Sequence, residues 1–156
     1  MSSQYKNDIV QSDRIIYTPS LFARSNLIHL QEIGRLKAMV PHVSKRENLP
    51  SFLFFVVEEG SGFLEYENET HKLEVGDCAF LDCRKSYAQH SSEDLWTLRW
   101  VHFYGSNMSG IYDKYMERGG KVCFHPEDTD EYSGVLQSIY EIAGQNSYIT
   151  PIFLIR

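Results

Sequence analysis

The sequence predicts a mostly β protein in which a closed antiparallel barrel is followed by C-terminal helices. Two observations carry this prediction. Between residues 27 and 82, short apolar segments alternate with turn residues such as "GSG", "NET" and "GD", as in antiparallel strands that close into a barrel or sandwich. After residue 105 the apolar residues take helical spacing instead. The 156 residues, 42% of them hydrophobic, are enough for one domain with its own core.

The N-terminal part predicts an extended arm over residues 1–20. These residues are polar, lack a regular period and end in the turn-forming run Thr18-Pro19-Ser20. The barrel is expected over residues 21–106. Its strands are indicated by five short apolar segments: "LIHLQEIG", "FLFFVV", "FLEYE", "HKLEV" and "CAFLD".

The segment at residues 95–104, "LWTLRWVHFY", predicts a strand that is covered on both faces, because it is aromatic and apolar throughout. Strand alternation places five of its side chains on one side: Trp96, Leu98, Trp100, His102 and Tyr104. Two tryptophans and a histidine on one barrel face suit a stacking wall with a hydrogen-bonding group. Alternatively, both tryptophans fill the core. Arg46, ahead of the "FLFFVV" strand, has a fork of donors suited to a ligand hydroxyl or carboxylate.

Residues 107–156 predict a helical region. One helix is expected over residues 108–118, then a short strand in "KVCFHP", then a second helix from about residue 127 to Gly144. The second helix carries an apolar stripe that needs a partner, so we expect a homodimer that uses this stripe: Tyr132, Val135, Leu136, Ile139 and Tyr140. Thr150-Pro151 predicts the start of another helix, but the sequence stops after about one helical turn. We therefore expect a longer natural protein.

Charge and hydropathy narrow the function classes. The net charge of −6, without a run of five or more like charges, argues against direct contact with nucleic acid. The sequence has no signal-peptide core and no apolar run of the roughly 18 residues that a membrane span requires, which predicts a soluble cytoplasmic protein without a membrane partner. Cys78, Cys83 and Cys123 are expected to be reduced packing residues, because their spacing fits neither a disulfide framework nor a zinc knuckle.

Metal and nucleophile motifs are missing where a barrel enzyme would need them. Metal-binding barrels use several His or carboxylate ligands, from an H-x-H with a Glu on one strand and a His on a later strand. Here "PSFLFFVV" contains no H-x-H, and Tyr87 stands at the later histidine position. No G-x-S-x-G elbow is present. The sequence predicts no metal, no cofactor and no catalysis, and Glu58, Glu59 and Glu65 are expected to be solvated hairpin charges.

Three motifs occur in a specific order: "GDCAFLDCRKSY", "WTLRWVHFYG" and "VCFHPED". Together they resemble the N-terminal regulatory domain of AraC/XylS-type transcription regulators over about residues 20–143. The resemblance implies a cupin-like barrel, that is, a double-stranded β-helix or jelly roll, followed by helices that dimerise. It also implies a helix-turn-helix DNA-binding domain located C-terminally, which is missing from these residues, so that DNA is contacted only through that domain.

The resemblance further implies a small-molecule effector in the barrel, with a carbohydrate as one candidate. Trp100 matches the aromatic residue that stacks on sugar in the arabinose-responsive member, and Arg46 is the nearest match to its ligand-binding arginine. Leu98 and Gln89 replace a histidine and a tyrosine of that member, which argues against arabinose itself. Many relatives carry His at the position of Tyr87.

The sequence thus leads to the hypothesis of an effector-sensing and dimerisation domain of an AraC-type regulator. Its predicted ligand-binding residues are Trp100, Arg46, Trp96, His102 and Tyr87. Two alternatives stay open at this point: a small metal-dependent cupin enzyme acting on a sugar, and a structural dimer module with a fully packed barrel.

Overall fold

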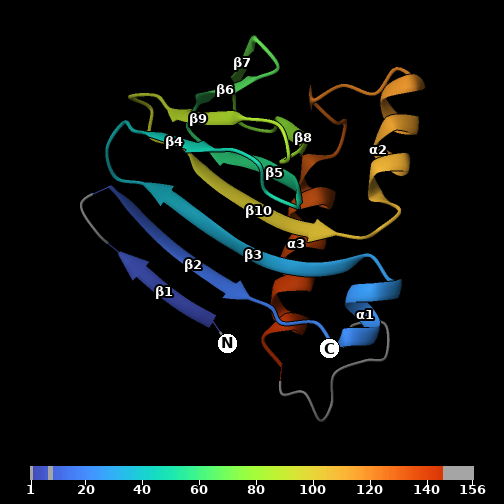
Figure 1. Cartoon of the computed structure of the whole chain (residues 1–156). Coiled ribbons are helices and arrows are strands. Elements are labelled where there is room, and N and C mark those ends of the chain that lie inside the picture. The colour runs from blue at the N-terminus through green and yellow to red at the C-terminus, as the bar shows by residue number, and fades with distance from the viewer. Residues whose placement is uncertain (1, 7–8, 146–156) are drawn as a thin grey trace.

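Two antiparallel sheets face each other in the computed structural model, which describes residues 2–6 and 9–145 (Figure 1). The larger sheet has the order β1-β2-β3-β10-β5-β8-β11 and the smaller has the order β4-β9-β6-β7. The strands of the larger sheet are β1 (Ser2–Lys6), β2 (Val10–Ile16), β3 (His29–Ala38), β10 (Thr97–Tyr104), β5 (Phe52–Glu59), β8 (Cys78–Asp82) and β11 (Cys123–Phe124). Those of the smaller sheet are β4 (Val43–Arg46), β9 (Tyr87–Ser91), β6 (Gly62–Tyr66) and β7 (Glu69–Leu73).

The strand β5 explains why the larger sheet is covered on both faces. Its alternate residues Leu53, Phe55 and Val57 belong to the core between the two sheets, whereas Val56 belongs to a second core beneath a helix. A strand buried on both sides is expected to be a continuous apolar run, as "FLFFVV" is. The mostly β fold with C-terminal helices is therefore confirmed.

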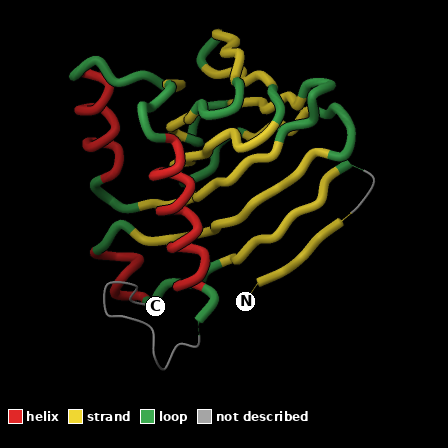
Figure 2. Tube along the Cα trace, turned by 180° about the vertical axis from the view of Figure 1, so that it is seen from behind, coloured by secondary structure: helices red, strands yellow, loops and turns green. Residues whose placement is uncertain are grey.

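The described residues form three helices, two of which pack on the sheets. The helix α3 (Thr129–Ala143) crosses the outer face of the larger sheet and packs on β3, β5 and β10 (Figure 2). The helix α2 (Met108–Glu117) packs over Phe52 at the end of β5, and α1 (Leu21–Asn26) is a short helix capped by the Ser20 hydroxyl. No helix in the described part of the chain has the length and hydropathy needed to cross a bilayer.

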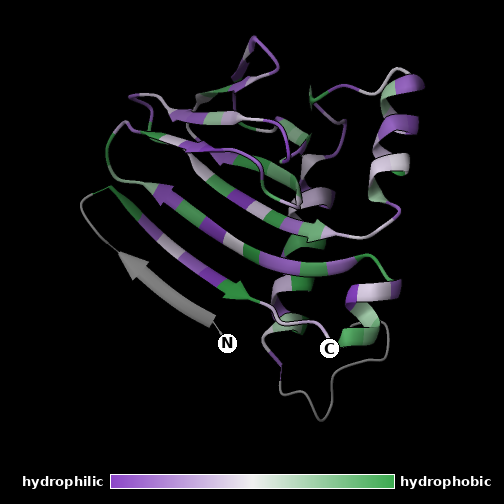
Figure 3. Cartoon of the chain, viewed as in Figure 1, coloured by the Kyte–Doolittle hydropathy of each residue, from purple (hydrophilic) through white to green (hydrophobic). Residues whose placement is uncertain are grey.

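The N-terminal segment differs from the extended arm that the sequence indicated. Residues 10–16 form β2, which pairs with β3 from Val10 opposite Ala38 to Ile16 opposite Glu32, and Ile15 is fully buried beneath the sheet. Hydrophilic residues fill the middle of this strand (Figure 3), so it lacks the alternation that would have predicted it. The segment that predicted a further helix at residues 150–156 lies outside the described residues.

Tyr104 is also placed differently from the prediction. The register between β10 and β3 shifts between His102 and Phe103, which breaks the strict alternation along β10. As a result Tyr104 stacks on Phe52 near α2, with ring centroids 6.3 Å apart, and does not join the inward row that ends at His102.

Candidate ligand-binding site

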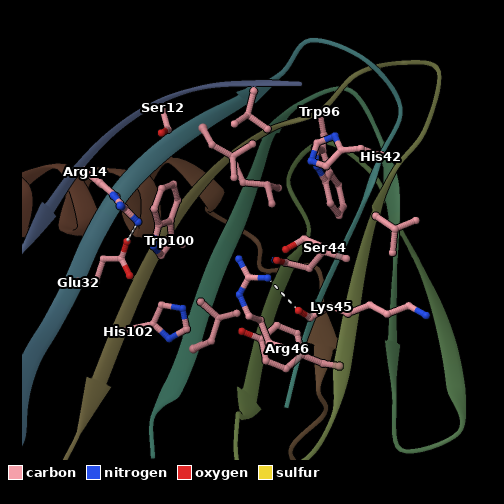
Figure 4. Close-up of a pocket in the computed structure, with 17 residues that line it drawn as sticks. Ser12, Arg14, Glu32, His42, Ser44, Lys45, Arg46, Trp96, Trp100 and His102 are labelled. Atoms are coloured by element: carbon pink, nitrogen blue, oxygen red, sulfur yellow. Dashed lines mark hydrogen bonds and ion pairs between the residues drawn. The ribbon is translucent and has the colours of Figure 1, made fainter. Parts of the chain in front are cut away.

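A cavity of about 580 Å³ lies between the two sheets, within the range of small-molecule pockets (Figure 4). One wall consists of β2, β3, β5 and β10, and the other consists of β4 and β9. The region between the sheets is thus packed at one end and open at the other. This finding disfavours a fully packed structural module.

A row of paired residues across β2, β3 and β10 positions the Trp100 ring, which forms the aromatic wall of the cavity. Arg14 lies opposite Gly34, and Gly34 lies opposite Trp100 on the next strand. A Cβ on Gly34 would lie 2.8 Å from Cη2 of Trp100 and 2.5 Å from the backbone oxygen of Asp13. The absence of a side chain at this position therefore lets the Trp100 ring lie across β3 toward Arg14.

We expect Gly34→Ala to lower the free energy of unfolding by about 1–3 kcal/mol, because the added methyl group overpacks against backbone atoms that cannot move independently. The same change displaces the Trp100 ring from the cavity wall. Gly110→Ala in α2 is the matched control, since nothing lies within 4 Å of a Cβ there. Urea denaturation of both variants measures the loss of stability. Equal denaturation midpoints for Gly34→Ala and Gly110→Ala would show that the Trp100 ring does not need a glycine at position 34.

The two tryptophans occupy different environments. Trp96 is 2% exposed and packs edge-to-face on Phe55, with ring centroids 6.2 Å apart, so it is part of the core between the sheets. Trp100 is only partly buried and turns its ring to the open part of the cavity (Figure 4). The core-filling alternative therefore holds for Trp96, whereas the ring of Trp100 lies where a stacking wall would be.

His102 adds a neutral hydrogen-bonding group next to this wall. Its Nδ1 lies 2.9 Å from the hydroxyl of Ser51, a residue that is almost fully buried. Burial, together with the smaller effect of the positive charge of Arg46, lowers the pKa of His102 to about 4. The imidazole is therefore uncharged near neutral pH and suits a polar, uncharged part of a ligand.

Arg46 and Tyr87 lie directly opposite each other on β4 and β9. The guanidinium of Arg46 projects into the middle of the cavity and donates to the backbone oxygen of Lys45 at 2.8 Å (Figure 4). Tyr87 is 5% exposed and forms part of the packed floor beside Cys83; burial raises the pKa of its hydroxyl, so it stays protonated.

All five predicted ligand-binding residues line this one cavity. The sequence missed the polar residues that β2, β3 and β4 contribute. Among them, Arg14 forms an ion pair with Glu32 at 3.2 Å at the edge of the cavity. Ser12, His42 and Ser44 also line it. No sequence signal marked these residues, because β2 and β4 were not predicted as strands.

Metal ligands do not converge in the described ranges. No group of three His, Cys, Asp or Glu side chains there could hold an ion, so the residues do not fit the metal site of a cupin enzyme. The three cysteines are free. Burial raises the pKa of each of the thiols of Cys78, Cys83 and Cys123 to about 12, which fits the predicted packing role.

The predicted dimerisation stripe is partly used within the chain. Leu136 is buried against the larger sheet, and Ile139 and Tyr140 pack on the same core. Tyr132 stacks on Phe54 with ring centroids 5.7 Å apart. Val135 is 54% exposed, so it is the residue of the stripe that is most available to another molecule.

A cavity with aromatic and hydrogen-bonding walls between two sheets is typical of small-molecule-binding domains. The family model for the AraC-like ligand binding domain matches residues 35–153. The chain belongs to this family, as its motifs implied. No curated protein sequence matches the chain.

Solved structures with a similar fold support the cupin-like architecture. The AraC-like transcriptional activator CuxR has a TM-score of 0.59 at 10% identity, and the match covers 93% of this chain and 52% of CuxR. A cupin 2 conserved barrel domain protein from Leptotrichia buccalis has a TM-score of 0.50 at 17% identity, covering 64% of this chain and 42% of that protein. Ectoine synthase from P. lautus has a TM-score of 0.50 at 12% identity, covering 80% and 83%. At these identities the likeness concerns the fold alone.

Proposed function

We propose that the chain is the effector-sensing and dimerisation domain of a transcription regulator, and that a small molecule with a carbohydrate-like ring binds in the cavity. The observation that carries this proposal is the partly buried ring of Trp100, which lines a cavity of about 580 Å³ together with Arg46 and His102. Catalysis has no part in it. The proposal divides the chain into an N-terminal segment (1–20), a sensor barrel (21–106) and a helical dimerisation region (107–156) of a cytoplasmic protein.

The strand β10 offers a route from the cavity to the helices. Trp100 and His102 face the cavity, whereas the intervening Val101 belongs to the core beneath α3. A ligand that favours one position of β10 would therefore also favour one position of α3. Its differential affinity for the two arrangements would shift their populations, and so change how an attached DNA-binding domain is presented.

A thermal-melt screen tests ligand binding. Sugars, sugar acids, divalent metal ions and a chelator are added separately to the full chain. A ligand present at about 100 times its dissociation constant should add about 2.7 kcal/mol to the free energy of unfolding, a rise of about 5–10 °C in melting temperature for a domain of this size. Stabilisation by a small polar molecule supports the sensor. Destabilisation by the chelator that one metal ion reverses contradicts it and supports a metal-dependent enzyme.

The homodimer gives a separate prediction. Because the Val135 side chain is 54% exposed on α3, Val135→Glu should leave the folding of the chain almost unchanged. If α3 forms the dimer interface, the buried charge should weaken association by about tenfold or more. Sedimentation at high micromolar concentration measures this. Gly134→Glu is the control, because it places the same charge about 100° around the helix; a wild-type chain that sediments as a monomer contradicts the prediction.

A further inference from the structure

The charges that face the cavity do not balance. Three formally charged side chains from the described strands project into it or onto its edge: Arg14, Glu32 and Arg46. Glu32 is already paired with Arg14 at 3.2 Å. Lys45 points away from the cavity (Figure 4). One positive charge, that of Arg46, is left without a counter-charge, in a chain whose overall charge is −6.

Arg46 has a polar partner but no carboxylate partner among the described residues. Its guanidinium donates only to the backbone oxygen of Lys45, at 2.8 Å. In the open cavity, water can solvate the remaining donors. A ligand that fills the cavity displaces this water, and a guanidinium that loses water without gaining a negative partner is strongly destabilised. A ligand carboxylate removes this penalty and matches the planar fork of donors.

The other cavity residues fit a ring that carries hydroxyl groups. Trp100 offers a flat apolar face at the side of the cavity opposite β4 (Figure 4). Ser44 and Gln89 lie directly opposite each other on β4 and β9, and both line the cavity. They can donate and accept hydrogen bonds. His102 adds no second positive charge near neutral pH, since its pKa lies at about 4.

We propose that the effector is a sugar acid or a similar monoanionic polyhydroxy carboxylate, with its carboxylate on Arg46 and its ring on Trp100. This inference rests on the proposed function and deepens it. If the inference holds, Arg46 alone distinguishes acidic from neutral sugars. It supplies the only uncompensated charge that the described strands direct into the cavity.

The test compares matched pairs that differ in charge at one carbon. Galacturonate and galactose, and glucuronate and glucose, are titrated against the full chain by calorimetry and by thermal melting. We expect at least one acid to bind about 10- to 100-fold more tightly than its neutral partner, the range for a hydrogen bond to a charged group. Raising the salt concentration should weaken binding of the acidic sugar but not binding of the neutral sugar.

Two variants assign this preference to Arg46. Arg46→Gln should abolish the difference between acid and neutral sugar, whereas Lys45→Gln, which removes the same charge from the adjacent outward-facing residue, should preserve it. Neutral sugars that bind as tightly as their acids overturn the inference and leave the proposed function supported. If no acid binds, the inference is overturned. The proposed function is overturned as well only if no neutral sugar and no other compound of the melt screen changes the melting temperature.

Discussion

Trp96→Ala should lower the free energy of unfolding by about 3–5 kcal/mol, the largest effect expected from a single substitution in this chain. The ring is 2% exposed and fills the core against Phe55, so its removal leaves a cavity that the sheets cannot close. Gly62 adds to the cost, because a Cβ there would lie 2.4 Å from the Trp96 ring; the glycine leaves room for the indole and nothing replaces it. Urea denaturation measures the loss.

Trp100→Ala provides the matched contrast. Trp100 is only partly buried and borders an existing cavity, so its removal should cost less than about 2 kcal/mol of unfolding free energy. It should instead weaken ligand binding by about tenfold or more, because a stacked ring contact is lost. If the two substitutions lower the free energy of unfolding equally, the assignment of Trp96 to the core and of Trp100 to ligand contact is contradicted.

Glu58→Ala should lower the free energy of unfolding by about 2–3 kcal/mol. Glu58 accepts from Arg35 and from Arg99, each at 2.8 Å, and Arg99 also donates to Gln137 on α3. The side chains of Glu58 and Arg99 are each 17% exposed. Removing the carboxylate leaves two guanidinium groups side by side with little water, which costs more than the loss of a surface ion pair.

Glu59→Ala is the control for this substitution. Glu59 follows Glu58 directly, is 61% exposed and reaches Arg35 only at 3.5 Å, so its loss should change the free energy of unfolding by less than about 0.5 kcal/mol. Chemical denaturation of the two variants separates the predictions. If both lose the same stability, the Arg35–Glu58–Arg99 cluster contributes no more than solvated charges do.

The same cluster predicts a pH dependence. Burial alone would raise the pKa of Glu58, but hydrogen bonds from Arg35 and Arg99 outweigh it and hold the pKa below its usual range. The unfolded chain therefore binds a proton at higher pH than the folded chain does. The stability that Glu58 contributes is present above about pH 4.3 and is lost as the pH falls through the lower folded pKa. The difference in free energy of unfolding between wild type and Glu58→Ala should therefore become smaller as the pH is lowered from about 4.3 through the folded pKa of Glu58.

The central strands of the fold follow directly from sequence pattern. The run "FLFFVV" and the aromatic segment at residues 95–104 became β5 and β10, and the helical spacings after residue 105 became α2 and α3. These elements were predictable because their apolar side chains face packed cores. The pattern failed only where β10 shifts register, so that Tyr104 left the row that the period predicted.

The strands that border the cavity could not be predicted in this way. Only Ile15 of β2 is buried, in the core beneath α3, whereas Ser12 and Arg14 on the opposite face of the strand line the open cavity. β4 is polar for the same reason. Glu58, expected to be a solvated hairpin charge, proved to be the centre of an ion cluster, because its partners come from β3 and β10, 23 and 41 residues away in sequence. A polar pocket wall and a long-range ion cluster both lack a local hydrophobic signal.

A fluorescence titration of single-tryptophan variants tests most directly whether the cavity beside Trp100 is the effector site. The chain has two tryptophans, so Trp96→Phe leaves Trp100 as the only reporter, and Trp100→Phe leaves Trp96 as the control. With a compound that raises the melting temperature, we predict a saturable change in Trp100 emission and little change in emission from the buried Trp96. A compound that stabilises the chain without altering Trp100 emission would contradict this assignment and place the binding site elsewhere.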